Sequence, residues 1–141
     1  MADADRLARI HRVREVQARL AQADEVRARD KAASEADLHD RIAGLAAAVA
    51  PQPVPLATAA SLGAAAVFRE RLQASAANAA VRVQTAELQL ERSRLATRAA
   101  LRDRTATEKL LERARAEEAA KEARKHEDAP PGGRRNRHEP C

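Results

Sequence analysis

The sequence predicts an all-α protein: an elongated antiparallel hairpin of two long helices in a coiled coil, with a disordered C-terminal tail. Three observations predict this fold. Two long stretches contain no proline, and three prolines lie between them at positions 51, 53 and 55. Large apolar residues recur every three or four positions in both stretches, as on one face of a helix. Alanine supplies 37 of the 141 residues and Leu, Ile, Val and Phe together only 24, which is too little volume for a thick core.

Residues 3–49 are expected to form the first helix. Its last four large apolar residues share one face because they are spaced 4-3-4: Leu38, Ile42, Leu45 and Val49. Between Val26 and Leu38 the stripe is polar or alanine and its phase drifts, so the sequence does not specify a regular two-stranded coil there.

The proline cluster ends this helix. Each proline removes a backbone N–H donor and disfavours helical geometry in the residue before it, so the first helix must end near Val49. Residues 50–57 are expected to form the turn. Thr58 or Ser61 is expected to cap the helix that follows.

Residues 58–124 are expected to form the second helix, which completes a hairpin over residues 1–125. One apolar stripe on it contains Phe68, Leu72, Ala76, Ala79, Val83, Ala86 and Leu90. A second stripe recurs at intervals of seven: Val67, Ala74, Val81, Leu88 and Leu95. One partner helix needs one stripe, so the second indicates a surface covered by another protein or by self-association, unless these residues only flank a broad apolar face. Residues 126–141 contain Pro-Pro-Gly-Gly and no apolar period, and are expected to be disordered.

The stripes also predict how the two helices are aligned. Facing residues of an antiparallel pair have a constant sum of residue numbers. That sum is 117 for six apolar or small pairs: Val49 with Phe68, Leu45 with Leu72, Ile42 with Ser75, Leu38 with Ala79, Val16 with Leu101, and Leu7 with Leu110. We expect this register to hold within one helical turn, and the longer second helix to project beyond the N-terminus.

The charge of the chain is uneven. Its formal net charge is +5, and residues 92–115 alone carry eight basic and three acidic side chains. This segment is either a contact surface for an acidic partner or a solvated helix face. Cys141 is the single cysteine, so no internal disulfide is possible and a reducing compartment is expected. The longest apolar run, residues 43–50, is too short to span a bilayer, and no secretory signal is expected, which favours a cytoplasmic location.

Catalysis is disfavoured because nothing in the sequence brings reactive groups together. The four histidines are scattered without a neighbour at metal-ligand spacing, and no Gly-rich phosphate loop is present, so we expect no enzyme, metal or cofactor. We expect no nucleic acid partner, because aromatic side chains that stack on bases are missing from the basic segment. The N-terminal helix is charge-balanced and lacks interfacial aromatics, which disfavours direct membrane binding. Binding to other proteins remains.

Three stretches resemble the FliJ family, the small coiled-coil proteins of the flagellar type III export apparatus, which are related to stalk proteins of injectisomes. The start, "RLARIHRVREVQARLAQA" (6–23), is similar to the family's opening helix. The middle, "VFRERLQASAANAAV" (67–81), resembles its segment after the turn. The end, residues 98–125, is similar to its C-terminal helix, in which a basic run precedes the pattern matched here by Glu108, Lys109, Leu110, Glu112 and Arg113.

The resemblance implies a fold and a set of partners. Members of the family fold as antiparallel two-helix coils that look like the stalk of rotary ATPases, without catalytic activity or cofactor. They bind the export ATPase ring and the cytoplasmic domain of the export gate, and they escort export chaperones. The chain would thus be cytoplasmic, peripheral to the inner face of the cell membrane through protein partners only, and monomeric when free.

The resemblance also implies two contact sites. The gate-binding residues would be Leu38, Ile42, Leu45, Val49, Phe68, Leu72, Ser75 and Ala79, which the register above also places in the seam between the helices. The family carries aromatic residues at the positions of Leu45 and Val49. The ATPase contact would lie at the paired termini, where Arg102, Arg104, Lys109 and Arg113 are basic. The alternative function is a generic coiled-coil scaffold or spacer, and a third is a basic coil associated with nucleic acid.

Overall fold

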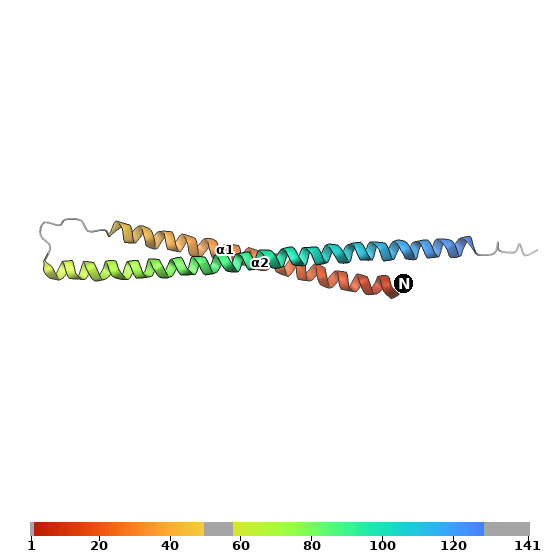
Figure 1. The fold of residues 1–141 in the computed structure, drawn as a ribbon, viewed down its shortest axis with the longest axis horizontal. Coiled ribbons are helices and arrows are strands. Elements are labelled where there is room, and N and C mark those ends of the chain that lie inside the picture. Colours follow the sequence, from red (N-terminus) through yellow and green to blue (C-terminus); the bar gives the residue numbers. More distant parts are fainter. Residues whose placement is uncertain (1, 50–57, 129–141) are drawn as a thin grey trace, which may run out of the picture.

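The computed structural model describes residues 2–49 and 58–128, which form two long α-helices. Helix α1 spans Ala2–Ala48 and helix α2 spans Ala59–Glu127. The helices run antiparallel and side by side as one elongated hairpin (Figure 1), which confirms the predicted all-α fold. Over the described ranges, neither helix has a stretch apolar enough to cross a membrane.

The caps of α2 explain where this helix begins and ends. Thr58 is the N-cap, because its side-chain oxygen accepts a hydrogen bond from the Ser61 backbone N–H at 3.2 Å. At the other end, the Asp128 N–H donates to the Arg124 carbonyl oxygen at 2.9 Å. The helix therefore extends three residues beyond its expected end at residue 124 and includes residues 126 and 127. The first helix-breaking residue of this region is Pro130, which disfavours helical geometry only from the residue before it.

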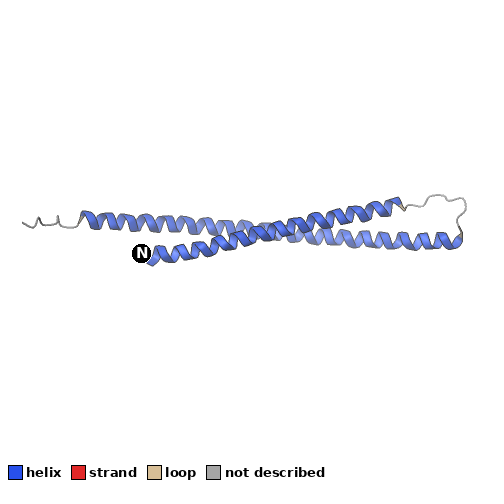
Figure 2. Cartoon of the chain, turned by 180° about the vertical axis from the view of Figure 1, so that it is seen from behind, coloured by secondary structure: helices blue, strands red, loops and turns tan. Residues whose placement is uncertain are grey.

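Two expectations concern residues that the structure does not describe. The turn at residues 50–57 and the tail from residue 129 lie outside the described ranges. The predicted projection of the second helix beyond the N-terminus concerns described residues and is confirmed. With 69 residues against 47, α2 extends past the N-terminal end of α1 (Figures 1 and 2).

Two contacts between the helices fix their register. His11 Nδ1 lies 3.2 Å from Thr107 Oγ1, and the Thr97 hydroxyl donates to the Ala21 carbonyl oxygen at 3.1 Å. The residue numbers sum to 118 in both pairs, against the predicted 117. The register is thus confirmed to within one helical turn, and the difference of one residue decides which side chains face each other.

The seam between the helices consists mainly of small residues. In α1 and α2 alike, the side chains with low exposure recur at alternating intervals of three and four, which is the spacing of a coiled coil. The buried residues are Ala4, Ala18, Ala28 and Ala32 on α1, and Ala79, Ala86, Ser93, Thr97 and Leu111 on α2. Ala18 is the most enclosed, with 1% of its surface exposed. Among the described residues, Leu111 is the single large apolar side chain that is buried.

The expected aliphatic seam is therefore confirmed only in part. Six of the seven residues of the first stripe of α2 are buried or half-buried, namely Leu72, Ala76, Ala79, Val83, Ala86 and Leu90, and Ile42 and Val49 of α1 are half-buried. Leu38, Leu45, Phe68, Val16 and Leu110 were expected to face the opposite helix, and all five are exposed. The reason lies in the period. Followed towards the N-terminus in steps of seven, the series that contains Leu45 and Leu38 meets Lys31 and Asp24, whereas the true seam passes through Ala32 and Ala18. A long contact follows the series that stays small or apolar over most of its length.

Polar side chains complete the seam. Glu35 is largely enclosed there, with 15% of its side chain exposed, and it pairs with Arg82 of the opposite helix. Arg82 Nη2 lies 2.8 Å from Oε2, but only Oε1, at 3.0 Å, has hydrogen-bond geometry, so Oε2 is held by charge alone. Arg14 and Asp103 form a second ion pair between the helices at 3.3 Å. The residue numbers of both ion pairs sum to 117, one less than in the two hydrogen-bonded pairs, because each arginine side chain is long enough to reach the neighbouring position. The ion pairs favour this register where alanine layers bury little area.

Candidate protein-binding surfaces

The large apolar side chains that the seam leaves out form three surfaces. The first lies near the turn, and we call it the turn-proximal patch: Leu38 and Leu45 on α1 and Phe68 on α2. Leu45 is 58% exposed and Phe68 53%, and Leu38 is exposed to a smaller extent. Each of the three directly precedes a seam residue, namely His39, Ala46 and Arg69. These three seam residues occupy the same position of the seven-residue repeat, because the next seam residue follows each of them after three positions. Corresponding flanks of two antiparallel helices lie on the same side, so these side chains share one side of the hairpin.

The structure brings together only part of the expected gate-binding set. The three residues of the turn-proximal patch and Ser75 are exposed. Ile42, Val49 and Leu72 are half-buried at the edge of the seam, and Ala79 is buried within it. A partner could therefore contact the patch directly and touch the edges of the half-buried side chains, but it cannot reach Ala79 while the hairpin is closed.

The second surface is the outer stripe of α2: Val67, Ala74, Val81, Leu88 and Leu95. Each of these residues lies two positions from the seam residues on either side, and therefore on the face opposite α1. Val81, Leu88 and Leu95 are 61–62% exposed and Val67 is 49% exposed. The sequence predicted this second stripe, and the structure shows that it faces outwards and does not merely flank the seam.

The third surface lies on α1 near the N-terminus: Val13, Val16 and Leu20 on its outer face, and Ile10 on its flank, directly before the seam residue His11. All four are exposed. Sequence reasoning missed this surface because it placed Val16 in the seam, opposite Leu101. The signal that could have found it was the phase drift of the stripe after Val26, since a series that drifts cannot stay buried along a straight partner.

The basic residues expected to bind the ATPase are divided between two environments. Arg102, Lys109 and Arg113 are exposed on the outer half of α2, beyond the end of its apolar stripe. Arg104 is half-buried in the seam, at the level of Arg14, and is not available in the same way. Further along α2, Lys125 Nζ lies 2.9 Å from Glu122 Oε1, and this hydrogen bond raises the pKa of Lys125.

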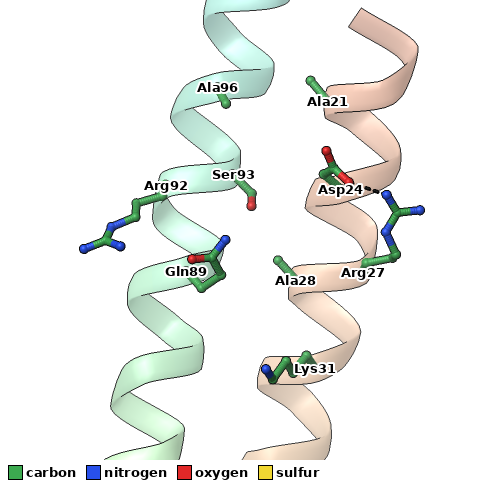
Figure 3. Close-up of a pocket in the computed structure, with 9 residues that line it drawn as sticks. All are labelled: Ala21, Asp24, Arg27, Ala28, Lys31, Gln89, Arg92, Ser93 and Ala96. Atoms are coloured by element: carbon green, nitrogen blue, oxygen red, sulfur yellow. Dashed lines mark hydrogen bonds and ion pairs between the residues drawn. The ribbon is translucent and has the colours of Figure 1, made fainter. Parts of the chain in front are cut away.

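The space between the helices is a shallow open groove and not an enclosed site. At mid-length it is lined by Ala21 and Ala28 of α1 and by Ser93 and Ala96 of α2, which point towards one another (Figure 3). Asp24 and Arg27 form an ion pair at its edge, and Arg92 points away from it. In residues 2–49 and 58–128, no three His, Cys, Asp or Glu side chains gather closely enough to hold a metal ion.

We compared the chain with protein-family models, curated proteins and solved structures. No protein-family model, no curated protein and no solved structure matches the chain.

Proposed function

We propose that the chain is a stalk-like, non-enzymatic component of the flagellar type III protein export apparatus. In this proposal it binds the export ATPase ring and the cytoplasmic domain of the export gate, and it escorts export chaperones. The observation that carries the proposal is the position of the large apolar residues: the fully buried part of the seam is mainly alanine, while most of the large apolar side chains of the described residues are exposed. Exposed apolar surface in excess of what folding requires is typical of sites of protein–protein contact.

Two features support the family assignment in particular. The sequence resembles the FliJ family in its opening helix, in the segment after the turn and in the C-terminal helix. The hairpin is also a rod whose longer helix projects at the terminal end, as a stalk that reaches into a ring requires.

We assign the export gate to the turn-proximal patch. Phe68 is the one aromatic residue of the chain and it is exposed there beside apolar residues of α1. Exposed aromatic side chains dominate the affinity of many interfaces because they bury a large area on contact.

We assign the ATPase to Arg102, Lys109 and Arg113. These three cations lie on one exposed face of α2 close to the paired termini, in the segment that accounts for the basic excess of the chain. Charged rims steer association with oppositely charged surfaces and make it sensitive to salt.

The test is binding of the full chain to the purified export ATPase of its native organism. We expect the variant Arg102→Glu/Lys109→Glu/Arg113→Glu to lose binding. The matched control reverses three exposed arginines of α1 that each pair with an acidic residue of their own helix, namely Arg19, Arg27 and Arg41. The control changes net charge equally and should bind normally.

The outcome separates the proposal from its alternative. If the wild-type chain fails to bind the ATPase, or if both triple variants bind equally well, the ATPase assignment is wrong. A generic coiled-coil scaffold would then be the better account, because the outward apolar surfaces serve that function equally.

A further inference from the structure

We propose that a second copy of this chain docks on the outer stripe of α2, parallel and in register, so that each residue of the stripe meets its own counterpart. This inference goes beyond the proposed function, because the stripe is separate from both the turn-proximal patch and the exposed cations. It also replaces the expectation of a free monomer, and one measurement decides between the two.

The stripe runs straight along α2, with one residue in every heptad, which is half the number that the a and d positions of a coiled coil provide. Its residues recur at intervals of seven from Val67 to Leu95, so they keep one azimuth along a shallowly crossing partner. This length corresponds to about 42 Å of helix, since each residue adds about 1.5 Å. The side chains are among the most exposed large apolar groups of the described residues, and α1 lies on the opposite side of α2, where it does not obstruct a partner.

The charges beside the stripe identify the partner as a parallel copy. Glu70 and Glu91 lie along one edge of the stripe, where Glu91 is also paired with Arg94 of its own helix, and Arg71 and Arg92 lie along the other edge. In a parallel dimer, opposite edges of the two helices meet, so Glu70 faces Arg71 of the second copy and Glu91 faces Arg92 of the second copy. Each pairing occurs twice by symmetry, and flanking charges of this kind set the orientation of coiled-coil partners.

The antiparallel alternative is disfavoured by the same four residues. A copy turned about Val81 would keep the apolar stripes in contact, but it would bring equivalent edges together. Glu70 would then face Glu91 of the second copy, and Arg71 would face Arg92 of the second copy. Like charges placed across a contact oppose that arrangement.

The surroundings also define where the contact ends. The next two residues of the series after Leu95 are Arg102 and Lys109, which would face their own counterparts and repel them. The two copies therefore diverge beyond Leu95. The outer surface of α1 is a poorer site for a second copy, because Arg9 and Arg12 lie beside it and the third bordering arginine, Arg19, is already paired with Glu15 of its own helix.

Disulfide trapping of the full chain tests the contact and its direction. In a Cys141→Ser background, Val67→Cys and Leu95→Cys are each expected to form a covalent dimer under mild oxidation. In an antiparallel dimer about Val81, neither residue meets itself, and a disulfide forms only when the two variants are mixed. Ala23→Cys, on the exposed outer face of α1, serves as the control for random collision.

Three results would overturn the proposal. The first is a Val67→Cys or Leu95→Cys dimer yield no higher than that of Ala23→Cys. The second is a disulfide found only in the mixture. The third is a monomeric mass for the wild-type chain in sedimentation at concentrations up to hundreds of micromolar, because a contact this thin is expected to be weak but measurable there.

A charge swap tests the flanking residues independently of the stripe. The variant Glu70→Arg/Glu91→Arg places only cations beside the stripe and should weaken the dimer by about tenfold or more, given the couplings measured for close charge pairs. Adding Arg71→Glu and Arg92→Glu restores opposite charges on the two edges and should restore dimerisation. Failure of this rescue, with helicity unchanged by circular dichroism, would contradict the assigned orientation.

The result is independent of the proposed function. Loss of ATPase binding in the Arg102/Lys109/Arg113 variant leaves the stripe intact, and the stripe variants leave those cations in place. A chain that dimerises but binds no ATPase would retain this inference and lose the proposed function.

Discussion

The hydroxyl group of Thr97 on α2 lies 3.1 Å from the backbone carbonyl oxygen of Ala21 on α1, and 3.0 Å from the carbonyl oxygen of Ser93 in its own helix. A contact between a side chain and the opposite backbone requires the helices to approach closely. The alanines around it permit that approach, because their methyl groups take up little of the space between the two backbones. The Thr97 contact therefore reports both the register of the two helices and their close approach at this point.

The first prediction concerns this hydrogen bond. Thr97→Val keeps the shape of the side chain and removes the donor, so the free energy of unfolding should fall by about 0.5–1.5 kcal/mol. Thr105→Val is the matched control, because the Thr105 hydroxyl bonds only to Leu101 of its own helix and is exposed. Urea unfolding followed by circular dichroism measures both. Equal losses in the two variants would mean that the contact with Ala21 contributes nothing.

The second prediction concerns the alanine layers. Ala18→Leu inserts three carbons where 1% of the side chain is exposed, and it should lower the free energy of unfolding by about 1–3 kcal/mol. The comparison is Ala23→Leu on the exposed face of α1, which should change stability by less than about 0.5 kcal/mol. If Ala18→Leu stabilised the hairpin, the seam would have room for large side chains and the close approach would be wrong.

The third prediction separates the buried leucine from the exposed apolar residues. Leu111→Ala removes the one large apolar side chain that the described part of the seam buries, and should cost about 2–5 kcal/mol. Leu45→Ala and Phe68→Ala should each cost less than about 1 kcal/mol, because neither side chain is buried. Thermal unfolding of the three variants provides the check. If Phe68→Ala lowered the stability as much as Leu111→Ala, Phe68 would have to be buried in the seam.

The fourth prediction concerns the gate. Leu38→Ser/Leu45→Ser/Phe68→Ser should abolish binding to the cytoplasmic domain of the export gate while leaving ATPase binding unchanged, because the two sites are far apart on the rod. Binding of the purified gate domain to the full chain is the measurement. The control is Val13→Ser/Val16→Ser/Leu20→Ser, which removes the same kind of exposed side chain from the outer face of α1. Loss of gate binding in both variants would point to a general effect of surface apolarity.

Much of the fold follows directly from the sequence. The proline cluster determined where α1 had to end and Thr58 was available to cap α2, because these residues act through local backbone chemistry. The register also followed, since a constant sum of residue numbers depends on the lengths of the helices about the turn more than on the identity of the facing residues. The predicted sum of facing residue numbers, 117, differs from the observed sum, 118, by one residue, which is less than one helical turn.

The seam residues were predicted only in part: the first stripe of α2 coincides with the seam from Leu72 to Leu90, but Phe68 and the α1 residues Leu38 and Leu45 do not. A rule that places the largest apolar side chains inside favours Leu38, Leu45 and Phe68, and it fails because their series continue through Lys31 and Arg82. Alanine gives little signal in a chain where it is the commonest residue. The position of Arg104 was missed for the same reason, because nothing in the sequence distinguishes a half-buried arginine in the seam from the exposed Arg102.

Alanine layers whose residue numbers sum to 118 hold the hairpin together, while most of the large apolar residues face outwards. Intramolecular disulfide formation in the full chain with Cys141→Ser tests this arrangement. We expect Ala18→Cys/Ala100→Cys, a pair that sums to 118, to close rapidly within one chain, and Val16→Cys/Leu101→Cys, a pair that sums to 117, not to close. Rapid closure of the second pair without the first would show that Val16 and Leu101 face each other in the seam and that the alanine layers do not.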